Sequence, residues 1–156
     1  MQILSDALCQ DFPSWDEIVR IVSMPLLVAW LVTPLRFTLE YIGINENYIF
    51  VIGLLWFSLG LAVYWSLKYA NRAYALKLLM VLMIVFSPLS RIPVAIAWWF
   101  DVEYQLGTHY GWYFDSFHQV LINHMFYGAL IQLLPSLLLA ALIIKVQNSK
   151  VKNPTS

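Results

Sequence analysis

Four long apolar runs constrain the fold of this chain more than any other feature of its sequence. The runs cover residues 18–44, 48–70, 73–100 and 117–146. Each run is longer than the roughly 20 residues that a helix needs to cross the hydrocarbon core of a bilayer. Because lipid offers no hydrogen-bond partners, each spanning segment must satisfy its own backbone, as a helix does. The sequence therefore predicts an all-α membrane protein, an antiparallel bundle of four transmembrane helices.

The composition agrees with a chain that lies mostly within lipid. Hydrophobic residues make up 61% of the 156 residues and charged residues only 12%, against roughly 25% in soluble domains. The formal net charge is zero, so there is no excess of basic side chains to bind nucleic acid. We expect a single integral membrane domain over residues 1–156, with membrane lipids around it and no nucleic-acid partner.

Local signals set the expected helix boundaries. Ser14 and Glu17 match a capping box, which places the start of the first helix at residue 15. The expected helices cover roughly 15–44, 48–70, 73–100 and 117–146, and the polar segment 147–156 is predicted to be a disordered cytoplasmic tail.

The second run carries small side chains at helical spacing. Ser58, Ala62 and Ser66 recur every four residues and so lie on one stripe of a helix. Small residues let helix backbones approach closely in lipid, where packing holds helices together. We interpret this stripe as a packing surface.

The distribution of lysine and arginine predicts the orientation in the membrane. Lys68, Arg72 and Lys77 lie at or near the connection between the second and third runs, and further lysines lie at and after the end of the fourth run. The other two connections contain only acids among their charged residues: Glu46, Asp101, Glu103 and Asp115. Because cytoplasmic loops carry the excess of positive charge, both termini are predicted to be cytoplasmic.

Two arginines interrupt the apolar runs, Arg36 in the first and Arg91 in the third. A charge at membrane depth is costly, so each arginine needs a partner or a function. Glu40 lies one helical turn after Arg36, which favours an ion pair between them. Glu40 is also the nearest acid at the depth of Arg91. We therefore expect Arg36, Glu40 and Arg91 to form one polar cluster in the outer half of the bundle.

Arg91 has three alternative interpretations. It is a strut between helices, a clamp for an anion or lipid headgroup, or a residue that extends to the interface. The clamp is chemically reasonable because guanidinium presents a planar fork to phosphate or carboxylate. Asn123 and His124 on the fourth helix are the other side chains expected to line a ligand pocket with the cluster.

The three histidines do not have the spacing of a metal site. His118 and His124 are six residues apart, so one straight helix cannot turn both toward one ion. The first three runs contain no histidine, which argues against haem held by two histidines within one chain. No His-Glu-x-x-His pattern occurs. We expect no metal and no cofactor.

These observations favour a small membrane subunit, or a non-enzymatic binding or transport component, with a polar pocket in the outer half of the bundle. Its expected partners are membrane lipids, an anionic lipid or small-molecule ligand, and other copies or subunits in an oligomer. The first alternative is an integral membrane enzyme acting on a lipid or isoprenoid with an anionic headgroup, in which Glu40 or a histidine acts as acid or base. The second alternative is a metal- or haem-binding redox subunit.

Overall fold

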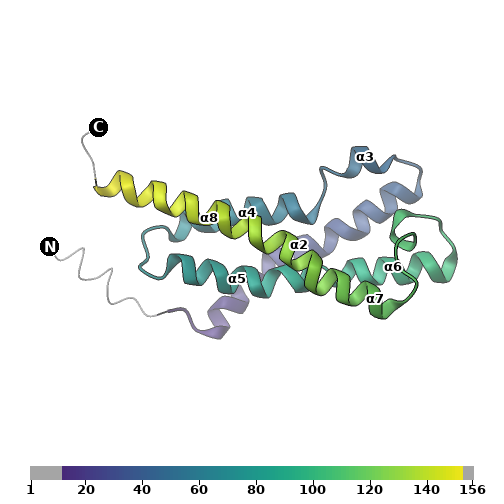
Figure 1. The fold of residues 1–156 in the computed structure, drawn as a ribbon, viewed down its shortest axis with the longest axis horizontal. Helices are drawn as coiled ribbons and strands as arrows, with labels where there is room; N and C mark the ends of the chain where they lie inside the picture. The colour runs from purple at the N-terminus through teal and green to yellow at the C-terminus, as the bar shows by residue number, and fades with distance from the viewer. Residues whose placement is uncertain (1–11, 153–156) are drawn as a thin grey trace.

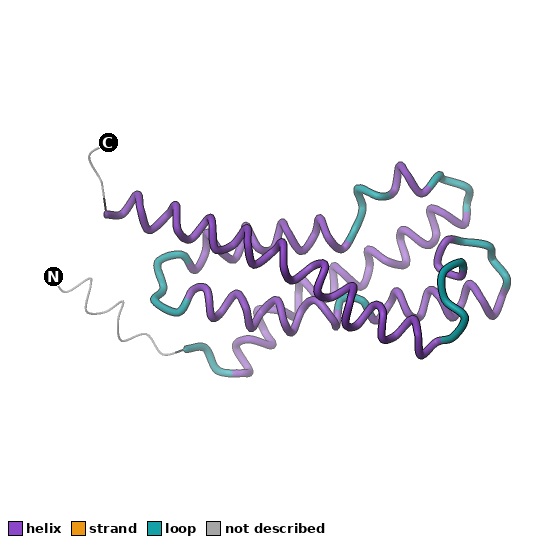
Figure 2. Tube along the Cα trace, in the orientation of Figure 1, coloured by secondary structure: helices purple, strands orange, loops and turns teal. Residues whose placement is uncertain are grey.

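The protein forms an all-helical bundle with short connections. A computed structural model describes residues 12–152, and helices make up most of that length (Figure 2). In chain order the elements are α2 (Trp15–Tyr41), α3 (Glu46–Ile49), α4 (Leu54–Tyr69), α5 (Ala75–Leu89), α6 (Ile92–Tyr104), the 3₁₀ turn η1 (His109–Gly111), α7 (Phe117–Ile122), the π-helical turn η2 (Asn123–Gly128) and α8 (Ala129–Lys152).

Four stretches within the described residues are long and apolar enough to cross a membrane: Trp15–Tyr41, Glu46–Tyr69, Ala75–Tyr104 and Phe117–Ser149. They run alternately up and down the long axis of the bundle (Figure 1). The start of α2, the end of α8 and the α4–α5 connection lie at one end, and the α2–α3 and α6–α7 connections lie at the other (Figure 1). The predicted fold class, an antiparallel bundle of four transmembrane helices, is confirmed, and the protein is integral to a membrane.

The core is built where α8 packs against α4 and α5, while α2 packs against α5 and α6. Ser58, Ala62 and Ser66 are all fully buried on α4, which confirms the packing stripe. Trp65 and Phe86 fill the space beside the stripe, with ring centroids 6.3 Å apart. Small buried side chains of this kind let neighbouring helices approach α4 closely, and α8 is one of these neighbours.

The helix ends differ from the sequence-based boundaries in several places. The first helix ends at Tyr41, and the second span is divided between Ile49 and Leu54. The capping box of Ser14 and Glu17 is confirmed at the start of α2. The third span continues past residue 100 to Tyr104, so Asp101 lies within the last turn of α6. Helix α8 continues to Lys152, so the predicted disordered tail is helical through that residue. A formed helix adds residues at little further cost in free energy, so it can extend past the apolar run. Residues 153–156 lie outside the described part.

The third span is broken between Leu89 and Ile92, where a short non-helical segment separates α5 from α6 (Figure 2). Pro93 has no N–H to donate to the carbonyl of Leu89. That carbonyl instead accepts a hydrogen bond of 2.9 Å from Trp30 Nε1 on α2. Arg91 is the residue that precedes α6, so the break sets the direction of its side chain.

Candidate functional site

A cavity of about 210 Å³ lies near the end of the bundle that carries the α6–α7 connection. Parts of α2, α4, α6, η1 and η2 surround it. Its polar and charged lining is made by Thr33, Arg36, Arg91, His109, Tyr110, Tyr113 and His124. Both arginines that interrupt the apolar runs therefore face one space.

Arg91 reaches from the α5–α6 break to the fourth span. Its Nε donates to Gln132 Oε1 at 2.9 Å, and its Nη1 lies 3.4 Å from His124 Nδ1. Arginine has only donors, so His124 Nδ1 must accept, and the neutral ring then carries its proton on Nε2. Gln132 is fully buried, which fixes the position of the guanidinium.

The π-helical turn η2 brings His124 and Gln132 to the same side. In an uninterrupted α-helix, positions eight residues apart differ by about 80° in direction, at 100° per residue. The extra residue accommodated by the π turn removes most of this difference. Gly128, within η2, lies directly against Arg91, and a Cβ built there would be 2.7 Å from Arg91 Cζ. The turn thus brings His124 and, from α8, Gln132 to the guanidinium, and it leaves space for the guanidinium at Gly128.

Arg36 lines the cavity from α2. Its Nε is buried and has no hydrogen-bond partner among the described residues. Thr33, one turn earlier on α2, is buried beside the same cavity. No described carboxylate lies within 4.0 Å of Arg36 or Arg91, since the one ion pair in this part of the chain joins His109 to Glu40.

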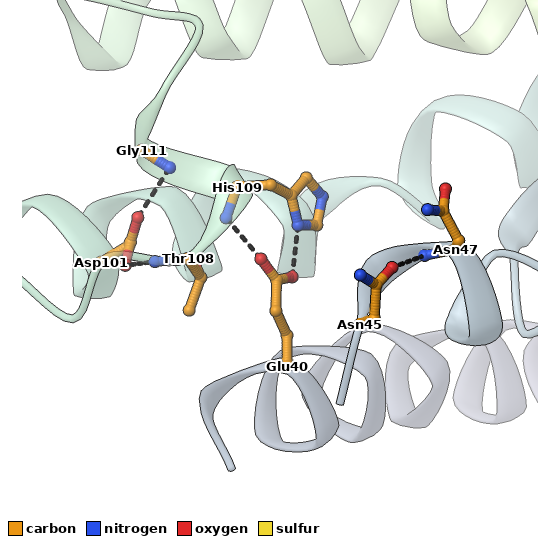
Figure 3. Close-up of polar contacts among 7 residues, drawn as sticks. All are labelled: Glu40, Asn45, Asn47, Asp101, Thr108, His109 and Gly111. Atoms are coloured by element: carbon orange, nitrogen blue, oxygen red, sulfur yellow. Dashed lines mark hydrogen bonds and ion pairs between the residues drawn. The ribbon is translucent and has the colours of Figure 1, made fainter. Parts of the chain in front are cut away.

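Glu40 binds His109 on the α6–α7 connection (Figure 3). Its Oε1 accepts from the His109 backbone N at 2.6 Å, and its Oε2 contacts His109 Nδ1. The expected pairing of Glu40 with Arg36 and Arg91 is therefore wrong. The reason is geometric: η1 packs over the end of α2 and occupies both carboxylate oxygens.

Asp101 holds the turn that presents His109 (Figure 3). Its Oδ1 accepts from Thr108 N at 2.9 Å and its Oδ2 from Gly111 N at 2.7 Å. Asp101 is only 3% exposed. Two backbone N–H groups thus hold this carboxylate, and the turn η1 is fixed to the end of α6.

Tyr110, in the same turn, is buried against the cavity. Its ring lies 5.6 Å from that of Phe37 and 4.1 Å from that of His109, measured between centroids. Burial raises the pKa of Tyr110 to about 12. The phenol therefore stays neutral at physiological pH and adds no charge to the site.

Not all of the predicted pocket residues face the cavity. Arg36, Arg91 and His124 line it, and Glu40 contacts it through His109. Asn123 instead donates from Nδ2 to the backbone carbonyl of Gln119 at 2.9 Å. The Asn123 side chain is therefore hydrogen-bonded within its own helical segment and does not line the cavity.

Several residues of the site were not predicted as pocket residues, among them His109, Gly128 and Gln132. His109 lies between the glycines at 107 and 111, and this glycine pair is the sequence signal for the turn that carries it. Gln132 was detectable as a lone polar residue in an apolar run, which in a membrane signals a buried partner. Nothing in the sequence around Gly128, beyond its being a glycine, indicated that it contacts Arg91.

The histidines are divided between two environments. His109 and His124 line the cavity, whereas His118 is exposed. Within residues 12–149 no three His, Cys, Asp or Glu side chains gather as a metal site would require. The expectation of no metal stays a prediction.

No protein-family model, curated protein or solved structure matches this chain.

Proposed function

We propose that this protein is a non-enzymatic binding or transport component of a membrane, and that its cavity binds an anion between Arg36 and Arg91. One observation carries the proposal: two guanidinium groups line a single cavity, and no described carboxylate lies within 4.0 Å of either. A buried charge without a counter-charge is costly. A bound anion supplies the missing negative charge.

The chemistry of the lining favours an oxyanion. Arg91 uses Nε and one N–H of Nη1 to hold Gln132 and His124, which leaves its other N–H groups for a ligand. Arg36 Nε is a further donor without a partner in the described part. Planar guanidinium groups match the oxygens of phosphate, sulfate and carboxylate. A lipid headgroup or a free solute carries the same groups.

Calorimetric titration of the purified full-length chain in detergent with sulfate tests the proposal. We expect Arg36→Gln and Arg91→Gln each to weaken sulfate binding about tenfold or more, because a hydrogen bond to a charged group contributes ~1.5–3 kcal/mol. Arg20→Gln is the matched control, since Arg20 is exposed on the same helix as Arg36.

The same titration in nanodiscs distinguishes the two sources of the anion. Competition by phosphatidic acid, but not by diacylglycerol, identifies a lipid headgroup, and no competition identifies a free solute. Equal sulfate affinities of the wild type, Arg36→Gln and Arg91→Gln proteins would contradict the proposal.

One contact favours a second candidate, an enzyme that acts on an anionic lipid. Glu40 orients an imidazole at the wall of the same cavity, as carboxylates orient the histidines of many acid–base sites. Chemical conversion of phosphatidic acid during the nanodisc titration, lost in His109→Asn, would favour this candidate over simple binding.

We further infer that both termini lie in the cytoplasm, with the cavity toward the outer leaflet. The lysines and arginines at the α4–α5 connection and near the end of α8 support this orientation. A reporter that is active only in the cytoplasm is expected to be active at either terminus. Activity of an export-dependent reporter fused after residue 152 would reverse the assignment.

A further inference from the structure

His109 stands between a carboxylate and the anion cavity. Glu40 contacts its ring at Nδ1, and both side chains are mostly buried, at 16% exposed for His109 and 13% for Glu40. His109 is also one of the residues that line the cavity. Its second nitrogen, Nε2, lies on the side of the ring away from Glu40 (Figure 3).

The contact with Glu40 fixes which ring nitrogen carries a proton. An ionised carboxylate only accepts hydrogen bonds, so Nδ1 must be the donor. In the neutral ring Nε2 is then unprotonated. Nε2 of His109 is therefore an open acceptor, which can take up one proton while Nδ1 keeps its bond to Glu40.

The charges around His109 determine whether a bound anion favours protonation of its ring. Arg36 and Arg91 carry one positive charge each, and Glu40 carries one negative charge. Tyr110 and Tyr113 are neutral phenols on the same cavity. His124 accepts from Arg91 at Nδ1, so a second proton there would break that bond and place two cations together. The groups that line the cavity, together with Glu40, thus carry a net charge of +1 when His109 is neutral. Two further carboxylates act on the same turn without lining the cavity: Asp101, which accepts from its backbone N–H groups, and Glu46 on α3.

A bound monoanion brings the site to neutrality, whereas a bound dianion leaves it at −1. A negative charge beside an imidazole favours the protonated ring. We propose that the cavity binds a dianion together with one proton, which His109 carries on Nε2 while Glu40 holds Nδ1. The inference rests on the proposed function, in that Arg36 and Arg91 must first bind an anion.

Proton-coupled binding selects a class of ligand. Phosphate monoesters and inorganic phosphate carry up to two charges near neutral pH, and sulfate carries two throughout that range. Diester headgroups carry one charge and are expected to bind without the proton. The same coupling would give a transport component a means of moving an anion with a proton.

Sulfate and methyl sulfate provide a matched pair of probes, because neither changes charge near neutral pH. Calorimetric titration of the full-length protein at about pH 7.5, in two buffers of different ionisation enthalpy, counts the protons taken up. We expect about one proton per bound sulfate and close to none per methyl sulfate. The affinity for sulfate should also fall as the pH is raised, by up to about tenfold per pH unit, because each bound sulfate takes up one proton.

His109→Asn keeps a donor in the place of Nδ1 and removes Nε2. It should abolish proton uptake with sulfate, and a thermal unfolding midpoint in detergent close to that of the wild type would show that the variant is folded. His118→Gln is the control, because His118 is exposed and away from the cavity.

The outcomes separate this inference from the proposed function. Sulfate binding by the wild type without proton uptake, or uptake that persists in His109→Asn, overturns the inference alone. Absence of binding by both probes overturns the proposed function and the inference with it. The wild-type titration decides the matter even where the variant does not fold.

Discussion

Replacing Gly128 with alanine is expected to destabilise the protein, because the added methyl group would collide with the guanidinium of Arg91. The new Cβ would lie 2.7 Å from Arg91 Cζ and 3.0 Å from its Nε. The guanidinium cannot move aside without losing Gln132 and His124. Overpacking of this kind costs about 1–3 kcal/mol, and the buried partners left behind add about 1–3 kcal/mol. Thermal unfolding in detergent should show a clearly lower midpoint.

Gly60→Ala is the matched control for this substitution. Gly60 is also a glycine within a membrane-spanning helix, and a Cβ there meets nothing within 4 Å. Alanine at that position should leave the midpoint unchanged or raise it slightly. The double variant Gly128→Ala, Arg91→Ala removes the colliding guanidinium, so its unfolding midpoint should be higher than that of Gly128→Ala alone. Equal midpoints for Gly128→Ala and Gly60→Ala would refute the close contact.

Replacing Asp101 with asparagine should release the turn that presents His109. The carboxylate accepts from Thr108 N and Gly111 N, one oxygen for each. Asparagine keeps one oxygen and turns an NH₂ donor toward the other N–H. An unmet buried donor costs about 1–3 kcal/mol. Hydrogen exchange should speed up at the amides of Thr108 and Gly111, and sulfate affinity should fall as His109 moves.

Glu103→Gln tests whether this effect is specific to the buried carboxylate. Glu103 is two residues from Asp101 on α6 and is exposed. The Glu103→Gln substitution should leave the amide exchange rates of Thr108 and Gly111 unchanged. If Asp101→Asn and Glu103→Gln give the same exchange rates, the turn is held by other contacts.

The fold was predictable because each apolar run carries its own signal. Run length, the capping box at Ser14 and the small stripe on α4 each act locally, and lipid leaves few alternatives to a helix. The end of α8 was less predictable, since a helix can continue past the apolar run on polar residues such as Lys152.

The site was only partly predictable because it depends on irregular backbone. Arg36 and Arg91 were identified as costly charges that needed partners. Their pairing with Glu40 was inferred from helical spacing and depth, which take no account of a loop folding back over a helix end. His109 on that loop binds Glu40 instead.

The partners of Arg91 were hidden for a related reason. Gln132 and His124 meet only because the π turn shifts the register of the fourth span. Periodicity applied to a regular helix places these two side chains on different faces. Irregular backbone of this kind within a membrane span is tolerated where protein surrounds it.

The position of a bound anion tests the central claim most directly. Selenate is a tetrahedral dianion like sulfate, and its selenium can be located by anomalous diffraction from crystals of the full-length protein. The account predicts one anomalous peak inside the cavity, within hydrogen-bond distance of the guanidinium groups of both Arg36 and Arg91. An empty cavity at saturating selenate, or a carboxylate side chain paired with either arginine there, would contradict it.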